Sequence, residues 1–371
     1  MIDRERMVIE FCELVAIDSP SYSEREMTDR LVAELRGLGF EVREDGAGAK
    51  MGGNAGNIYA YLPGTLEAEP ILFCGHTDTV VPACGKRAVV HEDGRITSAG
   101  DTVLGGDDLC AVVEIIEGVR HLIEEDIPHR PVEIVLMAAE EVFGKGAKAY
   151  DYEGHPFLSR EGYTLDLADP VGSAALRAPT MIGWTASLKG KAAHAGFAPE
   201  TGVNAILAAS RAVAKLSPGW VGDDTTMNVG TVRGGRANNI VPEECVVTGE
   251  VRSLDDAKAY RIIDDIRRTF EEAAGDAELT FAIDEHLVAY DVPESHSVVR
   301  RFVRACEKLG LPGRLTYTLG GSDNNILALH GITGIVLSCG MREVHSTGEY
   351  TEADDLVRGA ELVAELLMDA K

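Results

Sequence analysis

Apolar residues along the chain follow two alternating periods, which predict a succession of strands and helices. The apolar runs at 57–62, 71–76 and 132–139 have the length of buried strands. Between the second and third runs, residues 109–125 repeat apolar side chains at helical spacing. Strands that alternate with helices favour an α/β sheet with parallel pairs, flanked by helices.

A further helix is predicted near the start of the sequence. Met27, Leu31 and Leu35 recur at helical spacing. Ser23 and Glu26 have the three-residue separation of a capping box. We therefore expect Ser23 to be the N-cap of this helix.

The periodicity changes between residues 179 and 290. The segment from Met181 alternates with period two, as a half-exposed strand does. A helix, two strands, a second helix and a last strand follow, which is the order of a ferredoxin-like α+β unit. We predict that 179–290 is an inserted domain, and that 1–178 and 291–371 form one discontinuous α/β domain.

The composition is that of a globular chain with a strong negative charge. With 371 residues the chain exceeds one average domain, and its 45% hydrophobic content allows a core. There are 61 acidic and 35 basic residues, which gives a formal net charge of −26. Because this charge repels phosphate backbones and anionic lipids, we expect neither a nucleic acid nor a membrane surface as a partner.

The seven cysteines are scattered singly, without a CxxC pair. Isolated thiols in odd number are typical of a reducing compartment. The segment MIDRERMVIE is charged and lacks the apolar core of a signal peptide, and no apolar run has the length of a membrane span. We therefore predict a cytoplasmic protein.

Side chains that bind metals follow several predicted strands at their carboxyl ends. In open α/β sheets this edge binds ligands, and right-handed crossovers bring the strand ends together there. Acids directly after a buried strand must be paired or coordinated, because an isolated buried charge is too unfavourable. The residues concerned are His76, Asp78, Asp107, Asp108, Glu140, Glu141, Asp166 and His345.

Imidazoles and carboxylates without cysteine suit zinc, cobalt or manganese. A single catalytic zinc needs only three protein ligands. The candidates exceed that number, so we expect two metal ions bridged by one carboxylate. The predicted ligands are His76, Asp107, Glu141, Asp166 and His345.

Two further acids lie beside these ligands. Glu140 precedes the ligand Glu141, and a free carboxylate in that place is suited to act as the general base. Asp78 lies two residues beyond His76, on the same side of an extended chain. We predict that Asp78 holds the imidazole of His76 in place.

These motifs resemble those of the zinc exopeptidase family M20, and in particular its peptidase T-like branch, over nearly the whole chain. GHTDTV, GGDD, AAEE, YTLD and EVHSTGE are similar to the family's successive metal and catalytic motifs. The resemblance implies that Asp107 bridges two metal ions and that the Asp107–Asp108 peptide bond is cis. It also implies that the insert is a lid or dimerisation domain, and hence a homodimer.

The resemblance extends to four residues outside the metal motifs. GKAAHAG carries His194, ANNIV carries Asn239 and VRS carries Arg252. It implies that His194 reaches the partner subunit's active site and helps to polarise the scissile carbonyl. Asn239 and Arg252 would hold the substrate backbone or its carboxylate, a task that suits the arginine fork. Gly321 lies in GGSDNN, which resembles a substrate loop.

The chain departs from the family at one motif. Where the family often has GADDKAG, this sequence has GGDDLCA, so that Leu109 and Cys110 replace a lysine and a small residue. The predicted metal ligands are kept. We expect that a contact made to them by the replaced residues is lost.

These features predict metal-assisted hydrolysis of short peptides, as by a tripeptide aminopeptidase. An M20 amidohydrolase acting on dipeptides or N-acyl amino acids stays an alternative, because metal motifs do not separate these substrates. A non-catalytic metal-binding relative is disfavoured because Glu140 and Asp107 are both present. A dinucleotide-binding oxidoreductase is rejected because the Gly-rich segment 46–57 precedes a strand and is expected to open no helix.

Overall fold

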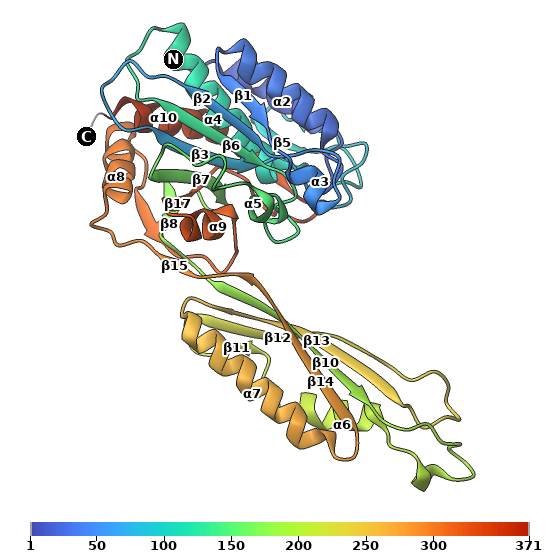
Figure 1. The fold of residues 1–371 in the computed structure, drawn as a ribbon. Helices are drawn as coiled ribbons and strands as arrows, with labels where there is room; N and C mark the ends of the chain where they lie inside the picture. Colours follow the sequence, from blue (N-terminus) through green and yellow to red (C-terminus); the bar gives the residue numbers. More distant parts are fainter. Residues whose placement is uncertain (1, 370–371) are drawn as a thin grey trace. The chain divides into compact units, whose positions relative to one another are not determined.

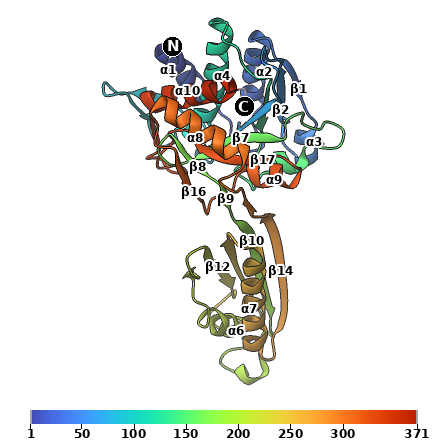
Figure 2. The same cartoon turned by 90° about the vertical axis from the view of Figure 1, so that its left-hand side faces the viewer.

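The computed structural model describes residues 2–369, which form two compact units (Figures 1 and 2). The first unit contains the described residues up to Arg177, together with Asp291–Tyr317 and the residues from Ser322 onward. The second unit contains Ala178–Tyr290. Four residues from a distant part of the sequence, Thr318–Gly321, join the second unit.

An eight-stranded sheet forms the centre of the first unit, in the order β1-β2-β6-β3-β7-β17-β8-β16 (Figure 1). Four of the neighbouring pairs are parallel: β3–β6, β3–β7, β7–β17 and β8–β16. The predicted mixed, mostly parallel sheet is thereby confirmed. The strands are β1 Glu41–Glu44, β2 Ile58–Leu62, β3 Ile71–His76, β6 Val132–Met137, β7 Glu161–Leu167, β8 Ser173–Ala175, β16 Arg314–Thr316 and β17 Thr333–Ser338.

Helices flank this sheet and complete the core. The long helix α4 packs against β3 and β7 and against α1 and α10, while α9 packs against β3 and β17. The helices are α1 Arg4–Val15, α2 Arg25–Gly37, α3 Ala47–Met51, α4 Gly106–Glu124, α5 Lys145–Ala149, α8 Ser297–Leu309, α9 Asp323–Leu329 and α10 Ala353–Met368. Smaller sheets are built from β4 Ala88–Val90, β5 Arg95–Ser98 and β18 Tyr350–Glu352, and from β9 Arg177–Ala178 and β15 Tyr290–Asp291.

The start of α2 differs from the prediction. The helix begins at Arg25 with Glu24 as its N-cap and without a side-chain cap, so the capping box at Ser23 is wrong. The buried carboxylate of Glu24 accepts hydrogen bonds from the Tyr22 N–H at 2.9 Å and from the Ala139 N–H at 3.0 Å. A long-range contact therefore outweighs the local capping preference.

The Gly-rich segment also differs from the prediction, because it contains the five-residue helix α3. The strands on either side of it, β1 and β2, are antiparallel neighbours in the sheet. A dinucleotide site requires a parallel βαβ unit at this place. The segment therefore still lacks the topology of a dinucleotide-binding turn.

The second unit is a five-stranded antiparallel sheet in the order β11-β12-β13-β10-β14, with two helices packed on one face (Figure 1). Trp184 and Phe270 lie in its core, with ring centroids 5.8 Å apart. The predicted ferredoxin-like α+β insert is confirmed. Its elements are β10 Thr180–Lys189, η1 Pro199–Thr201, α6 Ala205–Val213, β11 Gly219–Trp220, β12 Thr225–Gly234, β13 Glu244–Ser253, α7 Asp256–Ala274 and β14 Glu278–Leu287.

Within residues 2–369, every helix is too short or too polar to cross a membrane.

Candidate metal centre and catalytic residues

The end of β3 is joined directly to the start of α4. The His76 N–H donates to Asp108 Oδ2 at 3.0 Å. Gly75 makes this approach possible, because a Cβ there would lie 2.9 Å from the same oxygen. The apolar strand is buried along its whole length, so His76 is held rigidly at the carboxyl edge of the sheet.

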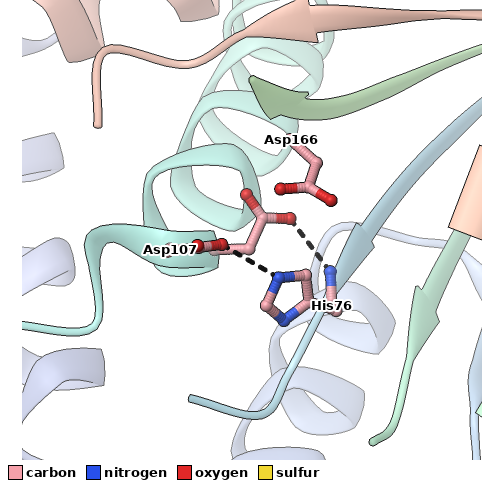
Figure 3. A group of neighbouring side chains, drawn as sticks. His76, Asp107 and Asp166 are labelled. Carbon is pink, nitrogen blue, oxygen red and sulfur yellow. Dashed lines mark hydrogen bonds and ion pairs between the residues drawn. The ribbon is translucent and has the colours of Figure 1, made fainter. Parts of the chain in front are cut away.

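The imidazole of His76 has a different partner on each nitrogen. Its Nε2 lies 3.1 Å from Asp107 Oδ1 (Figure 3). Its Nδ1 lies 2.9 Å from the backbone carbonyl oxygen of Asp78 and 3.4 Å from the Asp78 carboxylate. A carbonyl accepts only, so Nδ1 carries a hydrogen, and the lone pair of Nε2 would be available to a metal ion beside Asp107.

The Asp78 carboxylate serves mainly the turn that follows β6. Its Oδ1 accepts from the Glu140 N–H at 2.9 Å, and its Oδ2 accepts from the Glu141 N–H at 3.3 Å. Ser21 Oγ also donates to Oδ2, at 2.6 Å. Asp78 therefore orients His76 chiefly through its main chain, and orients the two glutamates through its side chain.

Asp107 lies between the two predicted histidine ligands. Its Oδ1 faces His76, and its Oδ2 lies 3.2 Å from His345 Nε2. His345 Nε2 is also 3.1 Å from Glu141 Oε2. The Asp107–Asp108 peptide bond is cis, as the resemblance implied. Two imidazoles on opposite oxygens of one carboxylate match the arrangement expected of a bridging ligand.

The five predicted ligands fall into two clusters that share Asp107. In each cluster the ligand atoms lie within 4.8 Å of one another. Figure 3 shows Asp166, from β7, converging with His76 and Asp107 from two other elements. The clusters are His76, Asp107, Asp108 and Asp166, and Asp107, Glu141 and His345. Asp108 was not predicted as a ligand, and its other oxygen accepts from Cys339 Sγ at 3.7 Å.

The electrostatics of the clusters fit a divalent cation. Burial, with Asp107 nearby, raises the pKa of Asp166 well above its ordinary value. Hydrogen bonds to Asp107 and Glu141 raise the pKa of His345 to about 10. Burial would lower the pKa of His76, but the surrounding acids raise it well above its ordinary value. Without a cation these groups retain protons, so positive charge is favoured at this place.

A buried oxygen atom without a hydrogen-bond partner also indicates that a cation is favoured at the clusters. Glu141 Oε1 is buried and has no hydrogen-bond partner among the described residues. A buried carboxylate oxygen without a partner is unfavourable. Imidazole nitrogens and carboxylate oxygens are ligands of zinc, cobalt and manganese, so the residues present fit such ions.

Glu140 stands beside the clusters at the end of β6. Its side chain is partly buried, and its N–H is held by Asp78. Burial raises the pKa of the Glu140 carboxyl well above its ordinary value, and the nearby Asp323 adds to this effect. A raised pKa brings a carboxylate toward the range of an effective general base.

The second unit carries His194 on an exposed loop after β10. The ring of His194 stacks on Phe197, with centroids 4.1 Å apart and planes at 15°. The Gly196 N–H donates to His194 Nδ1 at 3.1 Å, so in the neutral ring Nε2 carries the hydrogen. The exposed Asn239 lies on the neighbouring loop. Its backbone carbonyl oxygen accepts a hydrogen bond from the Ala195 N–H at 3.0 Å.

Arg252 also lies in the second unit, on β13. Its Nε and one Nη donate to the two carboxylate oxygens of Glu250 at 3.0 and 3.1 Å. The other Nη donates to the Leu319 carbonyl at 3.1 Å. Gly321 lies nearby in sequence, and a Cβ there would lie 2.1 Å from Leu287 Cδ1. A side chain at 321 would therefore require the end of the Leu287 side chain to move.

Three buried acids near the clusters were not predicted as functional residues. Glu24 binds Ala139, directly before Glu140. Asp323 is 2% exposed, and burial raises its pKa to about 7. Glu349 binds the backbone of the GGDD turn. Asp323 lies in GGSDNN and Glu349 in EVHSTGE, so these two motifs carried a signal for them.

The two residues that depart from the family motif both lie in the core. Leu109 and Cys110 are fully buried on α4. The ligand clusters keep their residues despite these replacements.

Known proteins are similar to this chain in sequence and fold. The Peptidase dimerisation domain family matches residues 179–278. The aminopeptidase PepT from Bacillus cereus is 36% identical, with 99% of this chain and 98% of that chain covered and a TM-score of 0.91. A tripeptidase from Staphylococcus aureus is 31% identical over 99% and 98% of the chains, with a TM-score of 0.95. The uncharacterised protein YqjE of Bacillus subtilis is 36% identical over 100% of both chains.

The fold and its relatives define a hydrolase of the peptidase class. The chain belongs to the M20 peptidase family, in its peptidase T-like branch. The resemblance seen in the sequence motifs is thereby confirmed.

Proposed function

We propose that this protein is a two-metal aminopeptidase that hydrolyses short peptides, and tripeptides in particular. The observation that carries the proposal is Asp107, whose two oxygens face His76 and His345 and belong to both ligand clusters. The relatives named aminopeptidase PepT and tripeptidase support this substrate class.

Each cluster would hold one metal ion, which we propose to be zinc, with cobalt or manganese as alternatives. His76, Asp107 and Asp166 would hold one ion. Asp107, Glu141 and His345 would hold the other. When bound, such ions polarise a scissile carbonyl and lower the pKa of water.

Glu140 would move the proton in this reaction. Its carboxylate takes a proton from the attacking water and later passes it to the leaving amine. The position of Glu140 is set on both sides, because Asp78 binds its own N–H and Glu24 binds the N–H of Ala139.

His194 and Asn239 would contact the substrate. With Nδ1 of His194 engaged by Gly196, its Nε2–H is free to donate to the carbonyl oxygen and stabilise developing negative charge. We propose that the protein is a homodimer through its inserted domain and that His194 acts in the partner subunit's active site. The match to a dimerisation domain supports this assembly.

The hydrogen bonds that Arg252 already makes favour tripeptides over dipeptides and N-acyl amino acids as substrates. Recognition of a substrate carboxylate next to the scissile bond needs an unoccupied arginine fork. The fork of Arg252 is already engaged by Glu250 and by the Leu319 carbonyl. An amidohydrolase that reads a nearby carboxylate with Arg252 would first have to break this pair.

We also propose that the protein acts in the cytoplasm, without a nucleic acid or membrane partner. All seven cysteines are free, as expected in a reducing compartment. The net charge of −26 disfavours both kinds of anionic partner.

The test is metal content and tripeptide hydrolysis, measured on the same preparations of the wild type and of Glu140→Ala. We expect about two metal ions per chain in both proteins, with hydrolysis falling by at least about a hundredfold in the variant. Two ions without hydrolysis of any tripeptide would move the substrate toward dipeptides or acylated amino acids. The two-metal site itself is excluded if neither protein binds metal after reconstitution.

A further inference from the structure

Glu349 is a buried acid that touches the main chain around Asp107. Its carboxylate is 1% exposed. Its Oε2 accepts from the Gly105 N–H at 2.7 Å, and its Oε1 accepts from the Asp107 N–H at 2.9 Å. These two N–H donors favour the ionised form of the carboxylate, and hydrogen bonds to an ionised carboxylate are the shorter and stronger kind.

The turn that Glu349 holds is not part of the regular helix. Asp107 has φ −84° and ψ 97°, and Asp108 has φ −124° and ψ 28°, so both are non-helical. The N–H groups of Gly105 and Asp107 therefore lack the partners that a helix would supply. Glu349 provides partners for both, and one of the two N–H groups belongs to Asp107 itself.

The two glycines of GGDD fit this turn between Glu349 and a buried lysine. A Cβ at Gly106 would lie 3.2 Å from Glu349 Oε1. Gly105 has φ +80°, and a Cβ there would lie 3.3 Å from Lys86 Cε. Lys86 is 1% exposed, and its Nζ donates to Thr79 Oγ1 at 3.1 Å. A buried cation thus lies on one side of the turn and a buried carboxylate on the other.

The same loop supplies both Glu349 and the ligand His345. Ser346 Oγ donates to the Glu343 carbonyl at 2.7 Å, and the Glu349 N–H donates to the Ser346 carbonyl at 3.2 Å. The loop is therefore a closed turn. It contacts Asp107 twice, at Oδ2 through His345 and at the N–H through Glu349.

We propose that Glu349 is a positioning residue for the metal centre, whose carboxylate fixes the Gly105–Asp107 main chain so that the two Asp107 oxygens face both clusters. The inference rests on the proposed function only in taking these clusters as the metal site. It concerns the metal affinity of the site and not the identity of the peptide.

The test compares Glu349→Gln and Glu349→Asp with the wild type in the full-length chain. Glutamine keeps the size of the side chain but offers only one acceptor oxygen, and aspartate keeps the charge but is one methylene shorter. We expect the affinity for Zn²⁺, measured by competition with a chelator, to fall about 10- to 100-fold. Amide hydrogen exchange at 104–108 should accelerate in the metal-free variants, and kcat should fall more than KM changes.

The matched control is Asp255→Asn, which weakens a cap in the second unit. Asp255 Oδ1 accepts from the Lys258 N–H at 2.9 Å, so this variant loses helix stability away from the metal clusters. We expect it to lower Tm without changing Zn²⁺ affinity. If Glu349→Gln behaves in the same way, Glu349 is only a cap and the inference is wrong.

Two other outcomes separate the inference from the proposed function. Should Glu349→Gln fail to fold, Glu349→Asp carries the test, and a folded Glu349→Asp with wild-type Zn²⁺ affinity overturns the inference. If the wild type binds Zn²⁺ but hydrolyses no tripeptide, the proposed substrate is wrong, while a loss of Zn²⁺ affinity in the variants still supports the role of Glu349.

Discussion

At the scale of single residues, the site depends on buried carboxylates that hold other site residues in position through hydrogen bonds. Asp78 is the clearest case, because it reaches His76 through its carbonyl and the Glu140–Glu141 turn through its carboxylate. One residue thereby connects the proposed ligand His76, from β3, with the proposed base at the end of β6. Its side chain is fully buried, so its hydrogen bonds face no competition from water.

Replacement of Asp78 by asparagine should therefore impair catalysis. The amide would direct an N–H₂ group toward donors that now meet a carboxylate oxygen. We expect kcat to fall about 10- to 100-fold, with a parallel loss of metal affinity. Steady-state kinetics and metal titration measure both effects.

Asp45→Asn is the matched control for this variant. Asp45 likewise accepts hydrogen bonds from backbone N–H groups, those of Ala47 and Asn57, each at 2.9 Å. It should affect stability without lowering kcat. Equal kinetic losses in the two variants would contradict the special role of Asp78.

At the scale of elements, β13 presents different chemistry on its two faces. Val251 is buried against the helices of the second unit, whereas Glu250 and Arg252 alternate with it and lie on the other face. The i, i+2 spacing places the two charged side chains together, and their bidentate pairing follows from it. A strand period thus sets which charged side chains lie together on this face of β13.

The variant Glu250→Gln should shift substrate preference. Removing the charge of Glu250 weakens its interaction with Arg252, because an ion pair between partly exposed side chains contributes up to about 1 kcal/mol. The fork of Arg252 would then be open to a substrate carboxylate. We expect kcat/KM for dipeptides and N-acyl amino acids to rise about tenfold relative to tripeptides.

A second ion pair in the same unit provides the comparison. Glu243 pairs with Arg236 at 2.8 Å, and Glu243→Gln removes a similar charge. This variant should leave the ratio of the two activities unchanged. A Glu250→Gln enzyme with the wild-type ratio would show that Glu250 does not control specificity.

At the scale of the whole molecule, the candidate metal centre gathers charged side chains from distant parts of the chain. His76, Asp107, Glu141, Asp166 and His345 come from separate elements and loops of the first unit. In the absence of metal, Asp166 and Glu141 have raised pKa values because they are buried, and His345 has a pKa of about 10 because of its acidic partners.

Metal removal should therefore make stability depend on pH in a defined direction. The folded chain retains protons on Asp166, Glu141 and His345 at pH values where the unfolded chain has released them, so stability falls as pH rises. For His345 this loss extends from its ordinary pKa near 6.5 up to about 10. We expect the Tm of metal-free protein to be lower at pH 9 than at pH 6, and added Zn²⁺ to raise Tm more at pH 9.

Thermal unfolding at both pH values, with and without chelator, checks this expectation. Other titrating groups contribute to any pH dependence, so metal-free His345→Gln is the reference. Its Tm should change less between pH 6 and pH 9 than that of the metal-free wild type. An identical change in both proteins would rule out His345 as a source of the effect.

The sequence by itself determined the order of the elements and the chemical type of the site. Apolar periods are local, so they predicted β3, α4 and β6. The ends of β3 and β6 gave His76 and Glu141 as predicted ligands, because parallel strands present their carboxyl ends at one edge. Asp107 follows no strand and lies in the first turn of α4. The change of period near residue 179 likewise separated the insert from the sheet around it.

Only the tertiary structure decided which acids support the ligands. Glu349 binds Gly105 across 244 positions of sequence, and Glu24 binds Ala139 across 115. A local motif can contain such an acid, as EVHSTGE contains Glu349, but it does not show which distant N–H groups the acid binds. The capping box at Ser23 was wrong for the same reason. A carboxylate acquires its role from the N–H groups and charges that the fold places around it, and folding brings these together from segments that show no relation in the sequence.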